Sequence, residues 1–312
     1  MKIAVLGGGG AMGGLFGAWL ARSGNDVALI DVSKAAIESI NGNGVRIDEK
    51  SGESSTIPVK ATNSPEAVGP VDVIVNFVKC YHTEAAVRSA LPMIGPETTV
   101  LSLQNGWGNA DRIAEVVGRK RVLVGLTYHS ATLLAPGHVR HPGTGITYLG
   151  ELGGETTSRL QAVADALKGA GFEVSVSTRI LDEVWKKLAL NVCTLPTAAL
   201  LRFSADQLNQ HDGTRAMMRG LLGEVGSVAR AQGIHLDEAE NWQAITTLLD
   251  RAVGARGSMV QDVEAGRLTE IDVINGAIVD AGTRHNIATP LNNSMVWMIK
   301  SLQERYLKDA KA

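Results

Sequence analysis

A cluster of glycines at residues 7–14 constrains this chain more than any other feature, because it directly follows a short apolar segment. That segment, Lys2–Leu6, is typical of a buried parallel strand. Residues 15–22 carry a helical pattern, and an apolar stretch from Asp26 to Asp31 predicts a second strand. The sequence therefore predicts a strand, a glycine-rich turn, a helix and a strand within about thirty residues, which is the start of a βαβ unit.

The glycines match the pattern G-x-G-x-x-G best at Gly8, Gly10 and Gly13, with Ala11 and Met12 before the last of them. Glycine in this pattern permits a tight turn, close approach of the backbone to a pyrophosphate, and close packing of helix on strand. The N–H groups at the helix start can bind phosphate oxygens. We predict that these five residues bind a dinucleotide in a Rossmann-type domain. The alternatives are a register shifted by one residue and a glycine-rich turn that binds no ligand.

Asp31 ends the second predicted strand, about twenty residues after the glycines. A carboxylate at this place can accept hydrogen bonds from the adenosine ribose hydroxyls and would repel the 2′-phosphate of NADP. It therefore favours NAD as the cofactor. Asp31 could instead be a solvated strand-end residue, and the nearby Lys34 could bind a phosphate, in which case the cofactor would be NADP.

Two further predicted strands end in polar residues. The apolar stretch 71–78 ends at Lys79, and the stretch 98–103 leads to an Asn105-Gly106 pair. Ligands in open α/β sheets bind beyond the carboxyl ends of the strands, so we expect Lys79 and Asn105 to line the cofactor crevice. Alternatively, Lys79 is a solvated residue before a helix, and Asn105 belongs to a turn chosen for its backbone.

The pattern changes from alternating strands and helices to helices alone near residue 178. Before this point, short strands over 121–150 are followed by a helix over 156–170 and a strand over 172–175. After it, we expect helices from residue 181 past 191, and over 214–231, 238–254, 258–265, 269–285 and 291–308. The predicted architecture is an α/β, Rossmann-type dinucleotide-binding domain, residues 1–178, followed by an all-α substrate and catalytic domain, residues 179–312.

The first helix of the second half carries two polar residues in an otherwise apolar stretch. Lys187 and Asn191 are four residues apart and therefore project from one face. A lysine that faces a dry cleft is a suitable general acid, because burial can lower its pKa toward the working pH. The alternative is a lysine in a surface salt bridge, and this is our interpretation of the neighbouring Lys186.

A second candidate segment, 267–270, is predicted to begin a helix, with Thr269 near the cap and Glu270 in the first turn. An acidic residue in a first turn complements the helix dipole. The pattern alone therefore gives Glu270 and Asp272 no more than a structural role.

Composition and charge exclude several classes of protein. The chain has 312 residues, a formal net charge of -2 and no long basic run, so neither nucleic acid nor an anionic membrane is an expected partner. No apolar run approaches the length of a membrane span. Cys80 and Cys193 match neither a metal site nor a disulfide framework, which favours a cytoplasmic protein. His129, His138 and His141 also lack metal-ligand spacing, so we predict surface or hydrogen-bonded histidines and no metal.

Several motifs along nearly the whole chain together carry a more specific signal than the glycines do. They are Val78-Lys79-Cys-Tyr, Leu103-Gln-Asn-Gly106, Pro136-Gly-His-Val-Arg-His-Pro-Gly143, Trp185-Lys-Lys-Leu-Ala-Leu-Asn191, and Ser258-Met-Val-Gln-Asp262 with Thr269-Glu-Ile-Asp272. In these motifs the sequence resembles the ketopantoate reductase (2-dehydropantoate 2-reductase) family. The resemblance implies an oxidoreductase that uses a nicotinamide cofactor and acts on a small carbonyl or hydroxy acid.

The resemblance also implies roles for individual residues. Lys187 would be the general acid that protonates the substrate oxygen as hydride arrives, and Glu270 would orient and tune that lysine or contact the substrate hydroxyl. The residues that would line the crevice or hydrogen-bond the substrate are Lys79, Asn105, Asn191 and Ser258. Independently of the family, reduction of a carbonyl creates an alkoxide, so a positioned cation that can release a proton is required.

Several positions depart from the family's pattern. Leu195 stands before Pro196, where the family usually has asparagine, and a second substrate-binding asparagine has no counterpart at 203–206. Where the family often has asparagine before the Ser-Met motif, the segment 255–257 instead brings Arg256, a candidate substrate-binding residue. A site built to hydrogen-bond a substrate discriminates strongly, so these losses predict a changed substrate.

We therefore expect an NAD-linked member of this family that acts on a small 2-oxo or 2-hydroxy acid or a related alcohol. The alternatives are a true NADPH-dependent ketopantoate reductase and a β-hydroxyacid-type dehydrogenase, whose early glycine-rich substrate motif is not evident. A non-catalytic dinucleotide sensor is a further alternative, but it would not need Lys187 and Glu270. A homodimer stays open, because the last helix could direct Met295, Trp297, Met298 and Ile299 into the core or into an interface.

Overall fold

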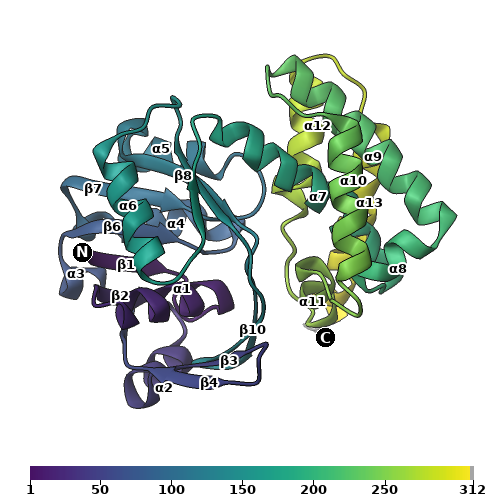
Figure 1. Ribbon diagram of the computed structural model, residues 1–312. Helices are drawn as coiled ribbons and strands as arrows, with labels where there is room; N and C mark the ends of the chain where they lie inside the picture. Colours follow the sequence, from purple (N-terminus) through teal and green to yellow (C-terminus); the bar gives the residue numbers. More distant parts are fainter. Residues whose placement is uncertain (310–312) are drawn as a thin grey trace. The chain divides into compact units, whose positions relative to one another are not determined.

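The computed structural model describes residues 1–309, and its contacts divide the chain into two compact units (Figure 1). Unit 1 comprises Met1–Gln104 and Asn109–Ile180, and unit 2 comprises Asn105–Gly108 together with the chain from Leu181. The predicted fold class is confirmed, because an α/β unit with a largely parallel sheet precedes a helical region. The domain boundary between residues 178 and 179 stays a prediction, and residues 310–312 of the predicted second domain lie outside the described part.

Unit 1 is built on a sheet of eight strands in the order β12-β11-β8-β7-β6-β1-β2-β5. The bounds are β1 (Lys2–Leu6), β2 (Asp26–Ile30), β5 (Lys60–Thr62), β6 (Val71–Asn76), β7 (Ile94–Ser102), β8 (Val122–Thr127), β11 (Thr147–Glu151) and β12 (Val174–Val176). Neighbours are parallel, except that β11 runs antiparallel to β8. The register pairs Leu6 with both Ile30 and Asn76, and Asn76 with Ser102. The carboxyl ends of four central strands are therefore level.

Alternate residues of the strands point to opposite faces of this sheet. Ile3 and Val5 belong to one buried cluster, and Ala4 and Leu6 belong to another. The first cluster includes side chains of α1 (Ala11–Arg22), α2 (Lys34–Asn43) and α6 (Ser158–Gly169). The second includes side chains of α4 (Thr83–Ser89) and α5 (Asn109–Val117), with the short α3 (Pro65–Val68) packed against it. Helices thus cover both faces of the sheet, as a doubly wound fold requires.

A second sheet of unit 1 has the order β4-β3-β10-β9. Figure 1 labels three of its strands, β3, β4 and β10. Its strands are β3 (Val45–Glu49), β4 (Ser54–Ile57), β9 (Ser130–Ala135) and β10 (His138–Gly143). His141 Nδ1 lies 2.7 Å from Glu49 and its Nε2 lies 3.0 Å from His129 Nδ1, while His138 lies 2.6 Å from Asp48. The three histidines are hydrogen-bonded, as predicted. Residues 1–309 hold no group of His, Cys, Asp and Glu side chains arranged for a metal ion.

Between residues 181 and 309, unit 2 contains helices and loops but no strand. Its α-helices are α7 (Ile180–Leu201), α8 (Ala205–Gln210), α9 (Asp212–Ala231), α10 (Glu238–Arg251), α11 (Ser258–Glu264), α12 (Asn275–Arg284) and α13 (Pro290–Asp309). On α13, Met295 and Ile299 are buried, whereas Trp297 is 63% and Met298 42% exposed. The last helix therefore divides its apolar residues between core and surface. No helix within residues 1–309 is long and apolar enough to cross a lipid bilayer.

One helix boundary differs from the sequence prediction. The helix expected over 269–285 begins only at Asn275, after a single 3₁₀ turn, η4 (Ile271–Val273). Thr269 donates from its N–H and its hydroxyl to Gln303, at 2.8 and 2.6 Å, which holds this segment against α13. Glu270 precedes the turn. The expectation that Glu270 lies in a first helical turn is therefore wrong.

A proline inside α7 is accommodated by an asparagine from α12. Pro196 has no N–H, so it cannot bond the carbonyl oxygen four residues earlier, that of Val192. Asn275 donates from Nδ2 to that oxygen at 3.3 Å and to Asn292 Oδ1 at 3.0 Å. Both asparagines are fully buried. The polar group that Pro196 leaves without a helical partner is thus paired by a side chain.

Candidate functional site

The glycine-rich turn has the geometry of a phosphate cradle. The N–H groups of Gly7 and Gly8 donate to the carbonyl oxygen of Ile30 at 2.9 and 3.1 Å, which ties the turn to β2. A β-carbon at Gly13 would clash with the Gly7 carbonyl oxygen, so only glycine allows α1 to pack this closely. Within the described chain, no side chain caps α1 at Gly10 and no acid stands in its first turn. The N–H groups of that turn can therefore bind an anion.

Asp31 belongs to the same loop cluster. Its carboxylate accepts hydrogen bonds from the N–H of Gly9 at 2.8 Å and from the N–H of Ser33 at 2.9 Å. These bonds fix the carboxylate beside the glycine turn, and an ionised carboxylate has further lone pairs for ribose hydroxyls. The uncapped helix start, the close packing at Gly13 and the fixed carboxylate together fit a nicotinamide dinucleotide.

A buried polar network at the ends of β6 and β7 was not predicted. Asn76 donates to Gln104 Oε1 at 2.9 Å, and Gln104 donates from Nε2 to Val78 O and to Thr83 Oγ1, both at 2.7 Å. Thr83 donates in turn to Asn109 at 3.3 Å. This network fixes the segment that contains Lys79, which is half-buried and precedes a 3₁₀ turn, η1 (Cys80–His82). The position of Gln104, next to Asn105 after a buried strand, was the signal that could have revealed it.

Within unit 2, Lys187 and Asn105 form the central pair of the candidate catalytic site. Lys187 Nζ donates to Asn105 Oδ1 at 2.9 Å. Burial of the ammonium group lowers the pKa of Lys187 to about 8, and the nearby Glu270 carboxylate opposes this shift. Glu270 is only 6% exposed. A lysine with such a pKa can both release and accept a proton near neutral pH.

Three contacts hold the Asn105–Gly108 segment in unit 2. The N–H of Trp107 donates to Val273 O at 2.8 Å, and the Trp107 ring meets Trp185 edge-on, with ring centroids 5.4 Å apart. Gly106 has φ +84°, and a β-carbon there would clash with the Val273 carbonyl oxygen. Only glycine therefore satisfies both the backbone conformation and the close approach. These contacts place Asn105 for the bond to Lys187.

Two further predicted residues of unit 2, Asn191 and Ser258, lie on two different helices. Asn191 is on α7, one turn after Lys187, and is 8% exposed. Its amide has no hydrogen bond within residues 1–309, so it can bind a ligand. Ser258 begins α11 and is exposed. The structure therefore brings Lys187, Asn105, Glu270 and Asn191 together, while Ser258 lies at the start of a separate helix.

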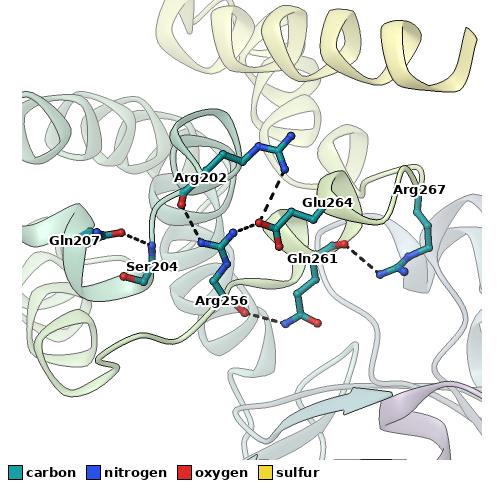
Figure 2. A network of polar contacts seen from close by, with 7 residues as sticks. All are labelled: Arg202, Ser204, Gln207, Arg256, Gln261, Glu264 and Arg267. Atoms are coloured by element: carbon teal, nitrogen blue, oxygen red, sulfur yellow. Dashed lines mark hydrogen bonds and ion pairs between the residues drawn. The ribbon is translucent and has the colours of Figure 1, made fainter. Parts of the chain in front are cut away.

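Arg256 belongs to a different polar network (Figure 2). It donates to the carbonyl oxygen of Arg202 at 2.9 Å, and its guanidinium forms an ion pair with Glu264. Gln261 donates to the Arg256 carbonyl oxygen at 2.8 Å. The charge of Arg256 is thus balanced by a carboxylate of α11. A role of Arg256 in substrate binding stays a prediction.

Comparison with known proteins gives matches over both units. Residues 3–154 match the family described as ketopantoate reductase PanE/ApbA, and residues 179–303 match its C-terminal part. A 2-dehydropantoate 2-reductase of Pyrococcus horikoshii is 34% identical over 304 residues, covering 97% of this chain and 98% of the relative. The corresponding protein of Halobacterium salinarum is 31% identical over 299 residues, covering 96% and 98%.

Solved structures give the same result. The structure of a D-mandelate dehydrogenase with NADH and anilino(oxo)acetate matches with a TM-score of 0.91 and 28% identity, covering 97% of this chain and 99% of the other. A PanE/ApbA family ketopantoate reductase from Ralstonia eutropha matches with a TM-score of 0.90 and 30% identity, covering 98% and 100%. Proteins similar to this chain thus include both kinds of enzyme.

Proposed function

Because the chain belongs to the ketopantoate reductase family, we propose that it reduces a small 2-oxo acid, or oxidises the matching 2-hydroxy acid, with NAD as the favoured cofactor. Family membership makes the chain an NAD(P)-dependent oxidoreductase that acts on CH–OH groups. The proposal adds the cofactor preference, the substrate class and the residues that do the chemistry.

The pairing of Lys187 with Asn105 is the observation that carries the proposal. The 2.9 Å bond orients the ammonium group, and burial lowers the Lys187 pKa to about 8. When bound, the nicotinamide supplies a hydride to the carbonyl carbon or accepts one from the alcohol carbon. Lys187 donates a proton to the resulting alkoxide oxygen, and in the reverse direction it accepts the hydroxyl proton. Glu270 stabilises the charged lysine, and the Asn191 amide hydrogen-bonds the substrate.

The preference for NAD rests on Asp31. Its carboxylate is fixed at the glycine turn by the Gly9 and Ser33 N–H groups, where the 2′-phosphate of NADP would meet a like charge. The D-mandelate dehydrogenase that resembles this chain was solved with NADH. The cradle itself is formed by Gly8, Gly10, Ala11, Met12 and Gly13, and Lys79 follows a neighbouring strand end.

A second candidate function is the NADPH-dependent reduction of 2-dehydropantoate. The 34% identity to the Pyrococcus horikoshii enzyme over nearly the whole chain favours it. Asp31, and Leu195 in place of a polar residue, favour the first candidate instead.

A direct test assays purified protein with NADH and NADPH in parallel, against 2-dehydropantoate and a panel of other 2-oxo acids. We expect NADH-linked reduction of at least one 2-oxo acid and a loss of at least about a hundredfold in kcat for Lys187→Ala. Lys186→Ala is the matched control, because Lys186 pairs with Glu183 at 2.9 Å on the same helix. Its activity should stay within about twofold of the wild type.

Two results would contradict the proposal. Faster turnover with NADPH and 2-dehydropantoate than with any other combination would establish the second candidate. Binding of NADH without turnover of any 2-oxo or 2-hydroxy acid would favour a dinucleotide sensor, and in that case Lys187→Ala would leave the binding constant unchanged.

A further inference from the structure

A third residue shares the face of α7 that carries Lys187 and Asn191. Leu195 follows Asn191 by four residues, as Asn191 follows Lys187, so the three form one stripe along the helix. We call Lys187, Asn191 and Leu195 the α7 stripe. With a rise of about 1.5 Å per residue, it extends over about 12 Å from the ammonium-bearing residue to the leucine.

The leucine end of the α7 stripe is apolar and held in place. Leu195 is half-buried, and its Cδ2 would lie 2.9 Å from a β-carbon at Gly257, so its side chain packs on the backbone before Ser258. Side chains of a helix lean toward its N-terminus, so Leu195 leans toward Asn191. A molecule whose reacting carbon lies at Lys187 and whose polar oxygens meet Asn191 would therefore extend its remaining carbon atoms toward Leu195.

The leucine end of the α7 stripe has a charged residue beside it in the sequence, and that charge is already paired. Arg256 directly precedes Gly257, but its guanidinium is paired with Glu264 and with the Arg202 carbonyl oxygen (Figure 2). A polar group carried by a ligand at Leu195 would lose its water without gaining the leucine as a hydrogen-bond partner. Moving an unpaired hydroxyl from water to such a place is unfavourable, whereas moving a methyl group there is favourable.

We propose that Leu195 selects substrates whose substituent on the 2-oxo group is apolar and branched or aromatic, and that it disfavours a hydroxyl group there. This inference rests on the proposed function, because it assumes that the reacting carbonyl lies at Lys187. It assigns to Leu195 the choice among 2-oxo acids, and it leaves the proton transfer to Lys187.

The test uses two substrates that differ by one hydroxyl group, 3,3-dimethyl-2-oxobutanoate and 2-dehydropantoate, its 4-hydroxy derivative. The wild type, with the preferred nucleotide, should have a kcat/KM about 10- to 100-fold higher for the first, since an apolar site rejects an added hydroxyl only to this extent. Leu195→Asn should lower this ratio at least about tenfold, because the amide can bond the hydroxyl. Leu201→Asn is the control, because Leu201 ends α7 and is exposed, so the ratio should not change.

The outcomes separate this inference from the proposed function. A wild-type ratio near or below one, or a ratio that Leu195→Asn leaves unchanged, overturns the role of Leu195 while the enzyme remains a 2-oxo acid reductase. Absence of turnover with every 2-oxo acid overturns the proposed function, and this inference with it. If Leu195→Asn does not fold, Leu195→Thr supplies a smaller hydrogen-bonding group and must shift the ratio in the same direction.

Discussion

Burial and a neighbouring charge shift the pKa of Lys187 in opposite directions. Loss of water around the ammonium group lowers its pKa from 10.5 to about 8, whereas the Glu270 carboxylate raises it. Burial has the larger effect, so a substantial fraction of the side chain is neutral in mildly alkaline solution. That balance suits a group that acts as an acid in one direction of a reaction and as a base in the other.

The pH dependence of the two directions should therefore be opposite. Reduction needs the protonated lysine, so its kcat/KM should fall as the pH rises through about 8. Oxidation needs the neutral lysine, so its kcat/KM should rise over the same range. Removing the carboxylate in Glu270→Gln removes the opposing effect, and the midpoint of both profiles should move below pH 8. Steady-state profiles between pH 6 and 10 measure this, and a midpoint that moves upward in Glu270→Gln would refute the assignment.

For individual residues, the sequence predicted which side chains belong to the candidate site better than it predicted which side chains they hydrogen-bond. Lys187 and Asn105 were both expected to be functional, one from its apolar helix and the other from its strand end. Their hydrogen bond joins residues 82 positions apart, and no local pattern contains that information. The bonds of Gln104 to Asn76 and Thr83 were not predicted either, because they form only once β6 and β7 are paired.

Among the elements, α7 combines an internal proline with the candidate catalytic face. Pro196 removes one helical hydrogen bond, and Asn275 of α12 replaces it by donating to Val192 O. The helix that positions Lys187 is therefore braced by a side chain from another helix.

Asn275→Ala should lower the free energy of unfolding of unit 2 by about 1–3 kcal/mol, because it leaves the buried Val192 oxygen without its partner. In a Pro196→Ala background the cost should be smaller, since the N–H of the new alanine can bond that oxygen. A double-mutant cycle measured by denaturant unfolding gives the coupling. If Asn275→Ala lowers the free energy of unfolding equally in the two backgrounds, Asn275 does not compensate for the N–H that Pro196 lacks.

Elements with a clear local pattern were predicted well, whereas contacts between distant segments were not. The strands β1, β2 and β6 and the helices α9 and α13 were placed within a few residues. The second sheet was missed as a unit, because β3 pairs with β10 across about ninety positions and no local pattern contains that pairing. The late start of α12 was missed because the bonds of Thr269 to Gln303 of α13 override a local capping pattern.

For the molecule as a whole, the pair of His129 and His141 makes the free energy of unfolding depend on pH. His141 Nδ1 lies 2.7 Å from Glu49 Oε2, and when it donates there its Nε2 is the acceptor for the Nδ1 proton of His129, 3.0 Å away. Within residues 1–309, His129 Nε2 is buried without a hydrogen-bond partner. A second proton on His129 would have no acceptor, and burial and His141 lower the pKa of His129 from 6.5 to about 4.

The protein should therefore lose stability as the pH falls from 6.5 toward 4. In this window the unfolded chain binds a proton at His129 that the folded chain does not bind, which favours unfolding. The free energy of unfolding should fall by about 1–2 kcal/mol. This is less than the full pKa shift of His129 would give, because the residue is only half-buried. Thermal midpoints of wild type and His129→Gln at several pH values measure it, and His285→Gln serves as the exposed control. Parallel pH curves for wild type and His129→Gln would rule out this cause.

The contacts of Asn105–Gly108 have a consequence for anyone who wishes to express the halves of this protein separately. A polypeptide that stops at residue 178 contains these four residues but lacks Trp185, Lys187 and Val273, which they contact. A polypeptide that starts at residue 179 contains the lysine but lacks Asn105. Dividing the chain at the boundary predicted from the sequence therefore separates Lys187 from its hydrogen-bond partner, Asn105. To preserve that pair, a chimera that exchanges the helical half must also transplant residues 105–108.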